Sequence, residues 1–206
     1  GFNWIESPGG PGLWRLAGID HEGKSKVINS CDAQASLLSE SGHRISLGFE
    51  GPEGLKVQLG VQAPPGDVLL WRLAVLNMGS LAEVERLDFP CLAGLALPPG
   101  DPELSYLAFP FEQGVLVRHP GSTVFGNEQA RSRMSGSYPG NCSMQFVAYG
   151  CRGGTGLYLA SHDPSGCAKR FTMERDGKGQ IAFYIENHLA NPALPGALPY
   201  PVAVAT

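Results

Sequence analysis

The sequence contains no uninterrupted apolar run of roughly 18 residues or more, which is the length that a membrane-spanning helix needs. Its first residues, Gly-Phe-Asn-Trp-Ile-Glu-Ser-Pro, include neither the basic segment nor the apolar segment of a signal peptide. We therefore expect no membrane partner. The expected location is the cytoplasm, or the exterior if a leader has been removed.

Positive charge is also scarce. Fifteen Lys and Arg residues face 19 Asp and Glu residues, which gives a formal net charge of -4, and the basic residues are dispersed along the chain. Proteins that bind DNA or RNA place clustered Lys and Arg side chains against the phosphates. Nucleic acid is therefore not an expected partner.

Several motifs of common enzymes and metal proteins are missing. There is no Gly-x-Ser-x-Gly motif, and the glycine clusters at 7–12 and 153–156 lack the Gly-Lys-Ser/Thr ending of a phosphate loop. The histidines stand apart from one another, so we expect neither a metal nor another cofactor. The odd number of cysteines and the absence of Cys-x-x-Cys favour incidental thiols over a disulfide framework, although a Cys142–Cys151 pair stays open. The five cysteines are Cys31, Cys91, Cys142, Cys151 and Cys167.

What the sequence does contain is a series of short apolar segments separated by glycine and proline. Residues 43–50 and 55–62 alternate between apolar and polar side chains, the pattern of a strand with one face in the core and one in water. Residues 67–77 are apolar on both faces apart from Arg72, which predicts the central and most buried strand. Val84 and Leu87, spaced by three in the next strand, predict a bulge.

The fold class predicted by this pattern is all-β. We count about ten to twelve strands or more, and no amphipathic helix of three turns; residues 31–40 allow at most one or two turns. No repeat of fixed period is present, which disfavours propellers and solenoids. The sequence predicts one large antiparallel β-sandwich over residues 1–190, followed by a proline-rich linker at 191–206.

The stretch 138–171 holds the residues that we single out. It predicts two strands joined by a glycine-rich turn, with the second strand running into His162-Asp163-Pro164. Loops at strand ends commonly display binding groups. The competing interpretation is a surface turn in which Asp163 accepts hydrogen bonds from its own backbone.

Segments of this stretch resemble a known family. Tyr138-Pro-Gly, Ser143-Met-Gln-Phe and Gly156-Leu-Tyr-Leu-Ala-Ser-His-Asp-Pro, preceded by Trp71-Arg-Leu-Ala-Val-Leu-Asn, resemble the N-terminal β-supersandwich region of large bacterial glycoside hydrolases. That region looks related to galactose-mutarotase-like sandwiches, and the resemblance extends over about residues 14–187. It implies a non-catalytic accessory domain that packs on a catalytic (β/α)₈ barrel of the same polypeptide. The tail at 199–206 is similar to the passage into the first barrel strand.

The resemblance implies carbohydrate as a partner and no catalytic residue within this chain. By position, Gln145, His162 and Asp163 are candidates for lining the sugar pocket from the sandwich edge, and Tyr138 and Tyr158 for stacking on sugar rings. Two alternatives stay open. One is a free-standing carbohydrate-binding module. The other is a small mutarotase-like or lyase-like enzyme in which His162 or His119 faces a carboxylate.

Overall fold

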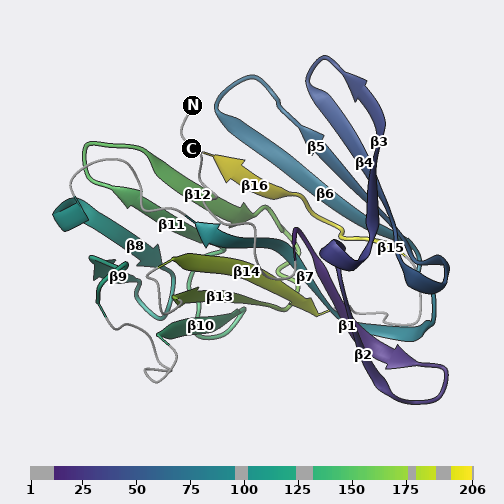
Figure 1. Cartoon of the computed structure of the whole chain (residues 1–206). Coiled ribbons are helices and arrows are strands. Elements are labelled where there is room, and N and C mark those ends of the chain that lie inside the picture. Colours follow the sequence, from purple (N-terminus) through teal and green to yellow (C-terminus); the bar gives the residue numbers. More distant parts are fainter. Residues whose placement is uncertain (1–11, 96–101, 124–131, 176–179, 189–195, 206) are drawn as a thin grey trace.

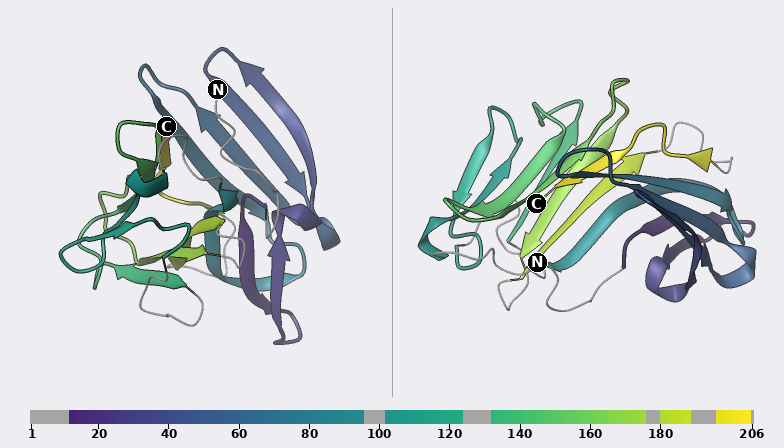
Figure 2. Two further views of the ribbon diagram at one scale, coloured as in Figure 1. Left: turned by 60° about the vertical axis from the view of Figure 1, so that its left-hand side comes forward. Right: turned by 90° about the horizontal axis from the view of Figure 1, so that it is seen from above.

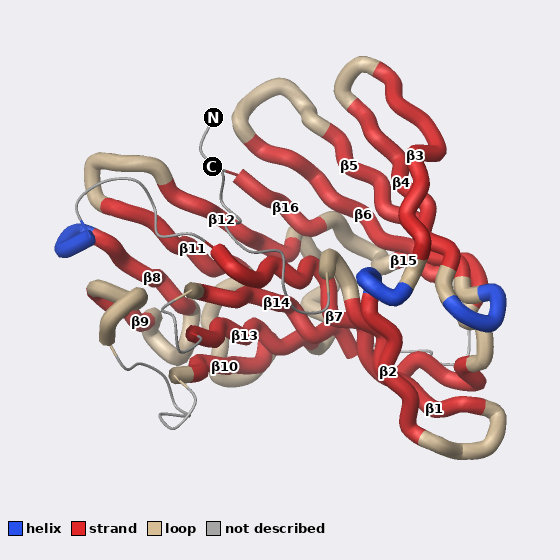
Figure 3. The backbone as a smooth tube through the Cα atoms, in the orientation of Figure 1, coloured by secondary structure: helices blue, strands red, loops and turns tan. Residues whose placement is uncertain are grey.

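The computed structural model describes residues 12–95, 102–123, 132–175, 180–188 and 196–205. These residues form sixteen strands in two antiparallel sheets and three short 3-10 turns, η1 (Ser30–Asp32), η2 (Pro52–Gly54) and η3 (Pro102–Leu104) (Figures 1 and 3). The predicted all-β class is therefore confirmed. The glycine cluster at 7–12, except for its last residue, and a turn expected at 176–179 lie outside the described residues.

The smaller sheet has six strands in the order β10-β13-β14-β7-β1-β2. Its strands are β1 (Arg15–Asp20), β2 (Ser25–Asn29), β7 (Leu81–Leu95), β10 (Arg133–Tyr138), β13 (Lys169–Arg175) and β14 (Ile181–His188). The β1–β2 hairpin closes at an Asp20 turn, where the carboxylate accepts backbone N–H groups of Glu22 and Lys24. Such local hydrogen bonding is why Asp favours tight turns.

The larger sheet has ten strands in the order β3-β4-β5-β6-β16-β12-β11-β8-β9, with β15 paired to β6 beside β16. Its strands are β3 (Gln34–Ser41), β4 (Arg44–Glu50), β5 (Lys56–Gln62), β6 (Val68–Asn77), β8 (Ser105–Phe109), β9 (Val115–Arg118), β11 (Phe146–Cys151), β12 (Gly156–Ser161), β15 (Gly196–Ala197) and β16 (Val202–Ala205). The β11–β12 hairpin confirms the pair of strands predicted within 138–171.

The core lies between the two sheets, where alternate side chains of each strand meet. Trp14 packs edge-on against Phe49 at a centroid distance of 5.6 Å, and Trp71 lies 6.3 Å from Phe89 of the smaller sheet. The smaller sheet covers only part of the larger one, because β3, β4 and β5 extend past it (Figures 1 and 2). The two layers therefore leave one end of the larger sheet without a second layer among the described residues.

Three local expectations need correction. Strand β6 is not the most buried element: Leu69, Arg72 and Leu76 are exposed, because no described layer covers its outer face and the smaller sheet covers only part of its inner face. Residues 31–40 form no helix beyond η1 and continue as β3, since pairing with β4 decides their conformation. Residues 127–137, rich in Arg, Ser and Gly, predict an extended loop, but the described residues 133–137 of that segment belong to β10, which pairs with β13.

Other expectations are confirmed or stay open. The bulge in β7 is present, because Ala17 pairs with Arg86 and Gly18 with Val84, so Glu85 has no partner in β1. The segment 191–206 was expected to be a linker, and the placement of a domain boundary at 190 stays a prediction. Its strand β16 nevertheless lies between β6 and β12 in the middle of the larger sheet.

Candidate functional site

The structure brings three of the predicted substrate-binding residues together around Lys169. Tyr138 and Lys169 are cross-strand partners on β10 and β13, while Gln145 precedes β11 and Asp163 follows β12. The Lys169 Nζ atom lies 2.6 Å from Asp163 Oδ2 and 2.9 Å from Gln145 Oε1. The ammonium group also lies 5.4 Å from the centre of the Tyr138 ring, within the range of a cation–π interaction.

The turn at 163–167 holds the Asp163 carboxylate in place. Its two oxygens accept the backbone N–H groups of Ser165 and Cys167 at 2.9 and 2.6 Å, which confirms the interpretation that Asp163 accepts hydrogen bonds from its own turn. Burial acts to raise the pKa of Asp163, but the hydrogen bonds from Lys169 and the two N–H groups outweigh it. The pKa is lowered, so the carboxylate stays ionised.

The cluster also links the C-terminal strand to the smaller sheet. Tyr200, just before β16, places its ring centre 4.6 Å from Lys169 Nζ and donates a 2.7 Å hydrogen bond from its hydroxyl to Asn187 Oδ1. Asn187 in turn donates to the carbonyl groups of Leu87, Phe89 and Ile185. Burial raises the pKa of Tyr200, so its hydroxyl remains a donor.

This arrangement is closed to solvent. The side chains of Lys169 and Asp163 are 0% and 1% exposed, and each makes the hydrogen bonds described above. Removal of one partner from a buried ion pair of this kind leaves an uncompensated buried charge and is strongly destabilising. The role of Tyr138, Gln145 and Asp163 in substrate binding stays a prediction, while their observed contacts join β10, β12, β13 and the tail.

The other two candidates lie elsewhere. Tyr158 is on the outer face of β12, where its ring lies 5.6 Å from Phe146 at an angle of 31°. His162 is exposed and donates its backbone N–H to the carbonyl of Pro201. His119, the histidine of the enzyme alternative, has Nδ1 3.7 Å from Glu103 Oε2, beyond hydrogen-bond distance.

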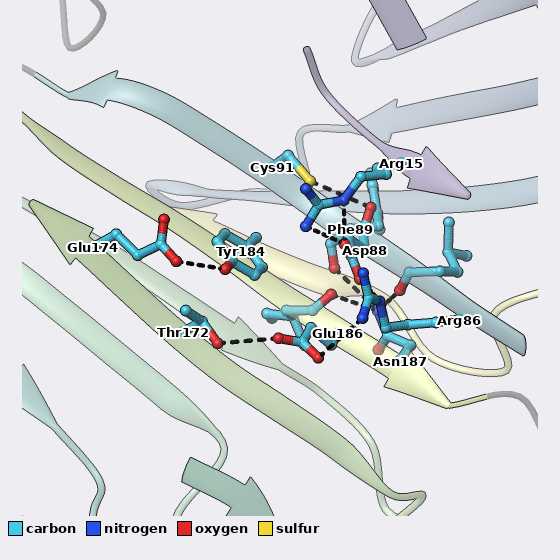
Figure 4. Close-up of polar contacts among 12 residues, drawn as sticks. Arg15, Arg86, Asp88, Phe89, Cys91, Thr172, Glu174, Tyr184, Glu186 and Asn187 are labelled. Carbon is cyan, nitrogen blue, oxygen red and sulfur yellow. Dashed lines mark hydrogen bonds and ion pairs between the residues drawn. The ribbon is translucent and has the colours of Figure 1, made fainter. Parts of the chain in front are cut away.

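A second polar cluster, which the sequence analysis missed, follows the outer face of the smaller sheet (Figure 4). Asp88 on β7 and Glu186 on β14 are cross-strand partners and both are buried. Arg15 contacts Asp88 at 2.5 Å, and Arg86 lies 2.9 Å from Asp88 and 3.8 Å from Glu186. The carboxylates are thus neutralised by arginines, an arrangement typical of structure rather than of paired catalytic acids.

The cluster continues along the same face. Arg133 lies 3.0 Å from Glu174 and 3.6 Å from Glu186, and the Tyr184 hydroxyl donates to Glu174 at 2.8 Å. Burial and this bond raise the pKa of Tyr184 to about 12. No pattern in the sequence predicts this cluster, because β7 and β14 lie about a hundred residues apart in the chain. Only the register between the two strands brings the charged side chains together.

Other kinds of site can be judged only where the structure describes the chain. All five cysteines fall within it and form no disulfide among themselves, so the Cys142–Cys151 pair is not made. Burial raises the pKa of Cys142 to about 11, as expected of an inert core thiol. In the same residues there is no group of three or more potential metal ligands and no helix that could cross a membrane.

The inner face of the larger sheet carries the most extended apolar surface. One cross-strand row runs Leu37, Leu47, Leu59 and Leu73 from β3 to β6. Leu73 and Leu59 are each 1% exposed under the smaller sheet, Leu47 is half-buried, and Leu37 is 59% exposed. All four side chains of the row are apolar, but the smaller sheet covers only the half of the row on β5 and β6.

A second row repeats this gradient. Ile45, Val61, Trp71 and Val202 are partners across β4, β5, β6 and β16. Exposure falls from 40% at Ile45, through half-buried Val61 and Trp71, to 0% at Val202. We call the uncovered end of these rows, together with Leu69 on β6, the overhang face. Its exposed residues are Leu37, Ile45 and Leu69, and the half-buried Val61 and Trp71 form its border with the core.

Comparison with known proteins finds the same fold in larger enzymes. No family model matches the chain, and no curated protein matches it. The α-galactosidase from Lactobacillus brevis superposes with a TM-score of 0.52 at 14% identity, over 92% of this chain and 28% of that one. The GH36 α-galactosidase AgaA from Geobacillus stearothermophilus gives 0.54 at 11% identity, over 94% and 30%.

A third structure agrees with these. The galactosidase domain of the α-galactosidase-sucrose kinase AgaSK gives a TM-score of 0.54 at 11% identity, over 92% of this chain and 29% of that one. The chain has the β-sandwich fold of a segment of these α-galactosidases. At such low identity the likeness concerns the fold alone, and the chain spans less than a third of the length of each. The expected sandwich of the glycoside hydrolase type is confirmed as a fold.

Proposed function

We propose that this chain is a non-catalytic accessory β-sandwich domain of a glycoside hydrolase, and that its overhang face packs on a catalytic domain outside this chain. The observation that carries the proposal is the pair of apolar rows that continue past the smaller sheet. A large exposed apolar patch on a soluble domain marks an interaction surface. The rows are continuous with the core, so a docked domain would extend the same apolar layer.

Two further observations support an accessory role. The acids that the structure buries, Asp88, Asp163 and Glu186, are engaged by arginine or lysine side chains. A pair of carboxylates working on a glycosidic bond needs one group free to donate a proton. The fold also occupies only 28% to 30% of the matching α-galactosidases, which leaves most of those proteins for other domains.

The proposal includes a substrate class for the whole polypeptide. Variants of AgaA have been crystallised with raffinose and with stachyose. We therefore take α-galactosides as the first substrates to test on the natural polypeptide that contains this chain, and a (β/α)₈ barrel as the expected catalytic domain. Binding of carbohydrate near Tyr138, Gln145, Tyr158, His162 and Asp163 belongs to the same proposal.

The test is binding between this chain and the remainder of its natural polypeptide, produced separately and measured by calorimetry. Leu37→Asp and Ile45→Asp place a charge on the overhang face and should weaken the association at least about tenfold, since burying an unpaired charge costs several kcal/mol. Val27→Asp is the matched control, because Val27 is a 56% exposed valine on β2 of the other sheet. Equal weakening by Val27→Asp would show that the interface is not confined to the overhang face. The absence of any association would refute the accessory role.

A further inference from the structure

A second surface lies at the opposite end of the larger sheet, away from the overhang face. An open hollow of about 340 Å³ is lined by residues of β8 and β9, within the size range of small-ligand sites. Its lining comes from η3, β8, β9 and the turn after β11. The strands β8, β9 and β11 lie at the left of Figure 1. The lining residues are Glu103, Leu104, Ser105, Tyr106, Leu116, Arg118 and Arg152.

The floor of the hollow is the ring of Tyr106, and two glycines make room for it. Tyr106, Gly150 and Gly156 are partners across β8, β11 and β12, on the outer face of the sheet. A Cβ atom on Gly150 would lie 3.0 Å from the Tyr106 hydroxyl oxygen and 3.2 Å from Cζ. Neither glycine has a positive φ, so the backbone does not require glycine here. The missing side chains let the ring lie across the neighbouring strands.

The rim of the hollow carries two guanidinium groups. Arg118 is the cross-strand partner of Tyr106, and Arg152 is fixed by a 3.0 Å hydrogen bond from its backbone N–H to the carbonyl of Leu104. Within the described residues, neither guanidinium nor the Tyr106 hydroxyl has a hydrogen bond or an ion pair. The lining also includes one acid, Glu103, whose Oε2 atom lies 3.7 Å from His119 Nδ1. Two exposed cations therefore flank an aromatic floor.

We propose that this hollow binds a saccharide that carries an oxyanion, such as a uronate or a sulfated sugar. The apolar face of a pyranose ring packs on an aromatic ring, and the tyrosine hydroxyl can bind a sugar hydroxyl. Arginine binds planar oxyanions with two parallel hydrogen bonds. Leu104 and Leu116, both exposed, add apolar surface to the lining. The site is independent of the docking proposal, because it uses the other end of the sheet and its outer face.

Nucleotides also combine an aromatic surface with an anion, but the hollow suits them less well. Nucleic-acid sites rely on several basic groups along a phosphate backbone. Among the described residues that line the hollow, the basic ones are Arg118 and Arg152, on a chain with a net charge of -4. A single anionic substituent on a sugar matches two guanidiniums and one aromatic face.

The test is calorimetric titration of the 206-residue chain with trigalacturonate, a sulfated galactotriose, neutral galactotriose and, as the nucleotide probe, ATP. We expect one or both anionic sugars to bind at least about tenfold more tightly than the neutral one, given the strength of charge-assisted hydrogen bonds. Comparison of the two anionic probes distinguishes carboxylate from sulfate. Equal affinity for all three sugars, tighter binding of ATP, or no binding of any probe would overturn the proposal.

Variants locate the binding. Arg118→Ala combined with Arg152→Ala should lower the affinity about tenfold or more, whereas Arg72→Ala, an exposed arginine on β6 of the same sheet, should leave it unchanged. Gly150→Ala would place a Cβ atom 3.0 Å from both the Tyr106 hydroxyl oxygen and the Gly156 Cα atom, so it should displace the ring or the β12 backbone beside it and weaken binding. If Gly150→Ala unfolds the chain, Tyr106→Ala tests the floor instead. Binding that survives loss of both arginines would refute the site.

Discussion

The two ends of the cross-strand row that runs from Leu37 to Leu73 on the inner face of the larger sheet have the same apolar pattern but different surroundings. At the β6 end, Leu73 is covered by the smaller sheet and belongs to the core. At the β3 end, Leu37 lies in the same cross-strand row and is uncovered. Alternation decides which face of a strand is apolar. It does not decide whether another layer covers that face, and this difference is the basis of the docking surface that we propose.

Two ion pairs show the same contrast between a covered position and an exposed one. Lys169 and Asp163 form an ion pair inside the sandwich, whereas Lys24 and Glu22 form one on the surface with both side chains more than 70% exposed. Both pairs have a distance of 2.6 Å. The surroundings, rather than the distance, determine what each pair contributes to stability.

The largest expected effect comes from breaking the buried pair. Lys169→Met should lower the free energy of unfolding by about 3–5 kcal/mol, because it leaves the Asp163 carboxylate buried without its cation. Lys24→Met is the matched control on the surface and should cost about 1 kcal/mol or less. Urea unfolding of both variants measures the difference. Similar small losses in the two variants would show that the Lys169 cluster does not hold the sandwich together.

The next effect compares two positions of one row. Leu73→Ala should cost about 2–5 kcal/mol, as for other buried leucines. Leu37→Ala should stay within about 0.5 kcal/mol, because its side chain already faces water in this chain. The unfolding midpoints in urea test both values. A large loss from Leu37→Ala would mean that the overhang face is covered in the isolated chain, and the comparison would fail.

The smallest expected effect is a dependence on pH. The pKa of Asp163 is lowered in the folded chain, so its contribution to stability is complete above the ordinary value of 3.8 and is lost as the pH falls below it. Asp163→Asn should therefore give a shallower decline of the melting temperature between about pH 5 and pH 2.5. Thermal unfolding followed by circular dichroism measures the slopes. Parallel slopes for the two proteins would contradict the assigned pKa shift.

Short-range patterns predicted much of the fold. The alternation in residues 43–62 identified β4 and β5, and the glycine-rich turn at 153–156 identified the β11–β12 hairpin. The same patterns failed for residues 31–40 and 133–137. There, pairing with β4 and with β13 imposes a strand that the local composition does not favour.

The candidate sites could be predicted only in part. Tyr138, Gln145 and Asp163 were predicted as site residues, and they do converge, but Lys169 at the centre of the cluster was not among the predicted site residues. The pairing of Asp88 with Glu186 could not be predicted, because the sequence around each residue does not show that the other will be its cross-strand partner. The hollow at Tyr106 was equally hidden, because its floor depends on glycines in two other strands.

The sequence by itself determined that this protein is built of strands and which side of most strands is apolar, because side-chain direction alternates with a period of two residues. The tertiary structure alone decided which strands become neighbours, where the tail enters the larger sheet, and which apolar rows remain uncovered. These outcomes depend on contacts between segments far apart in the chain. No local pattern specifies the partner of a strand edge or the extent of the layer above it.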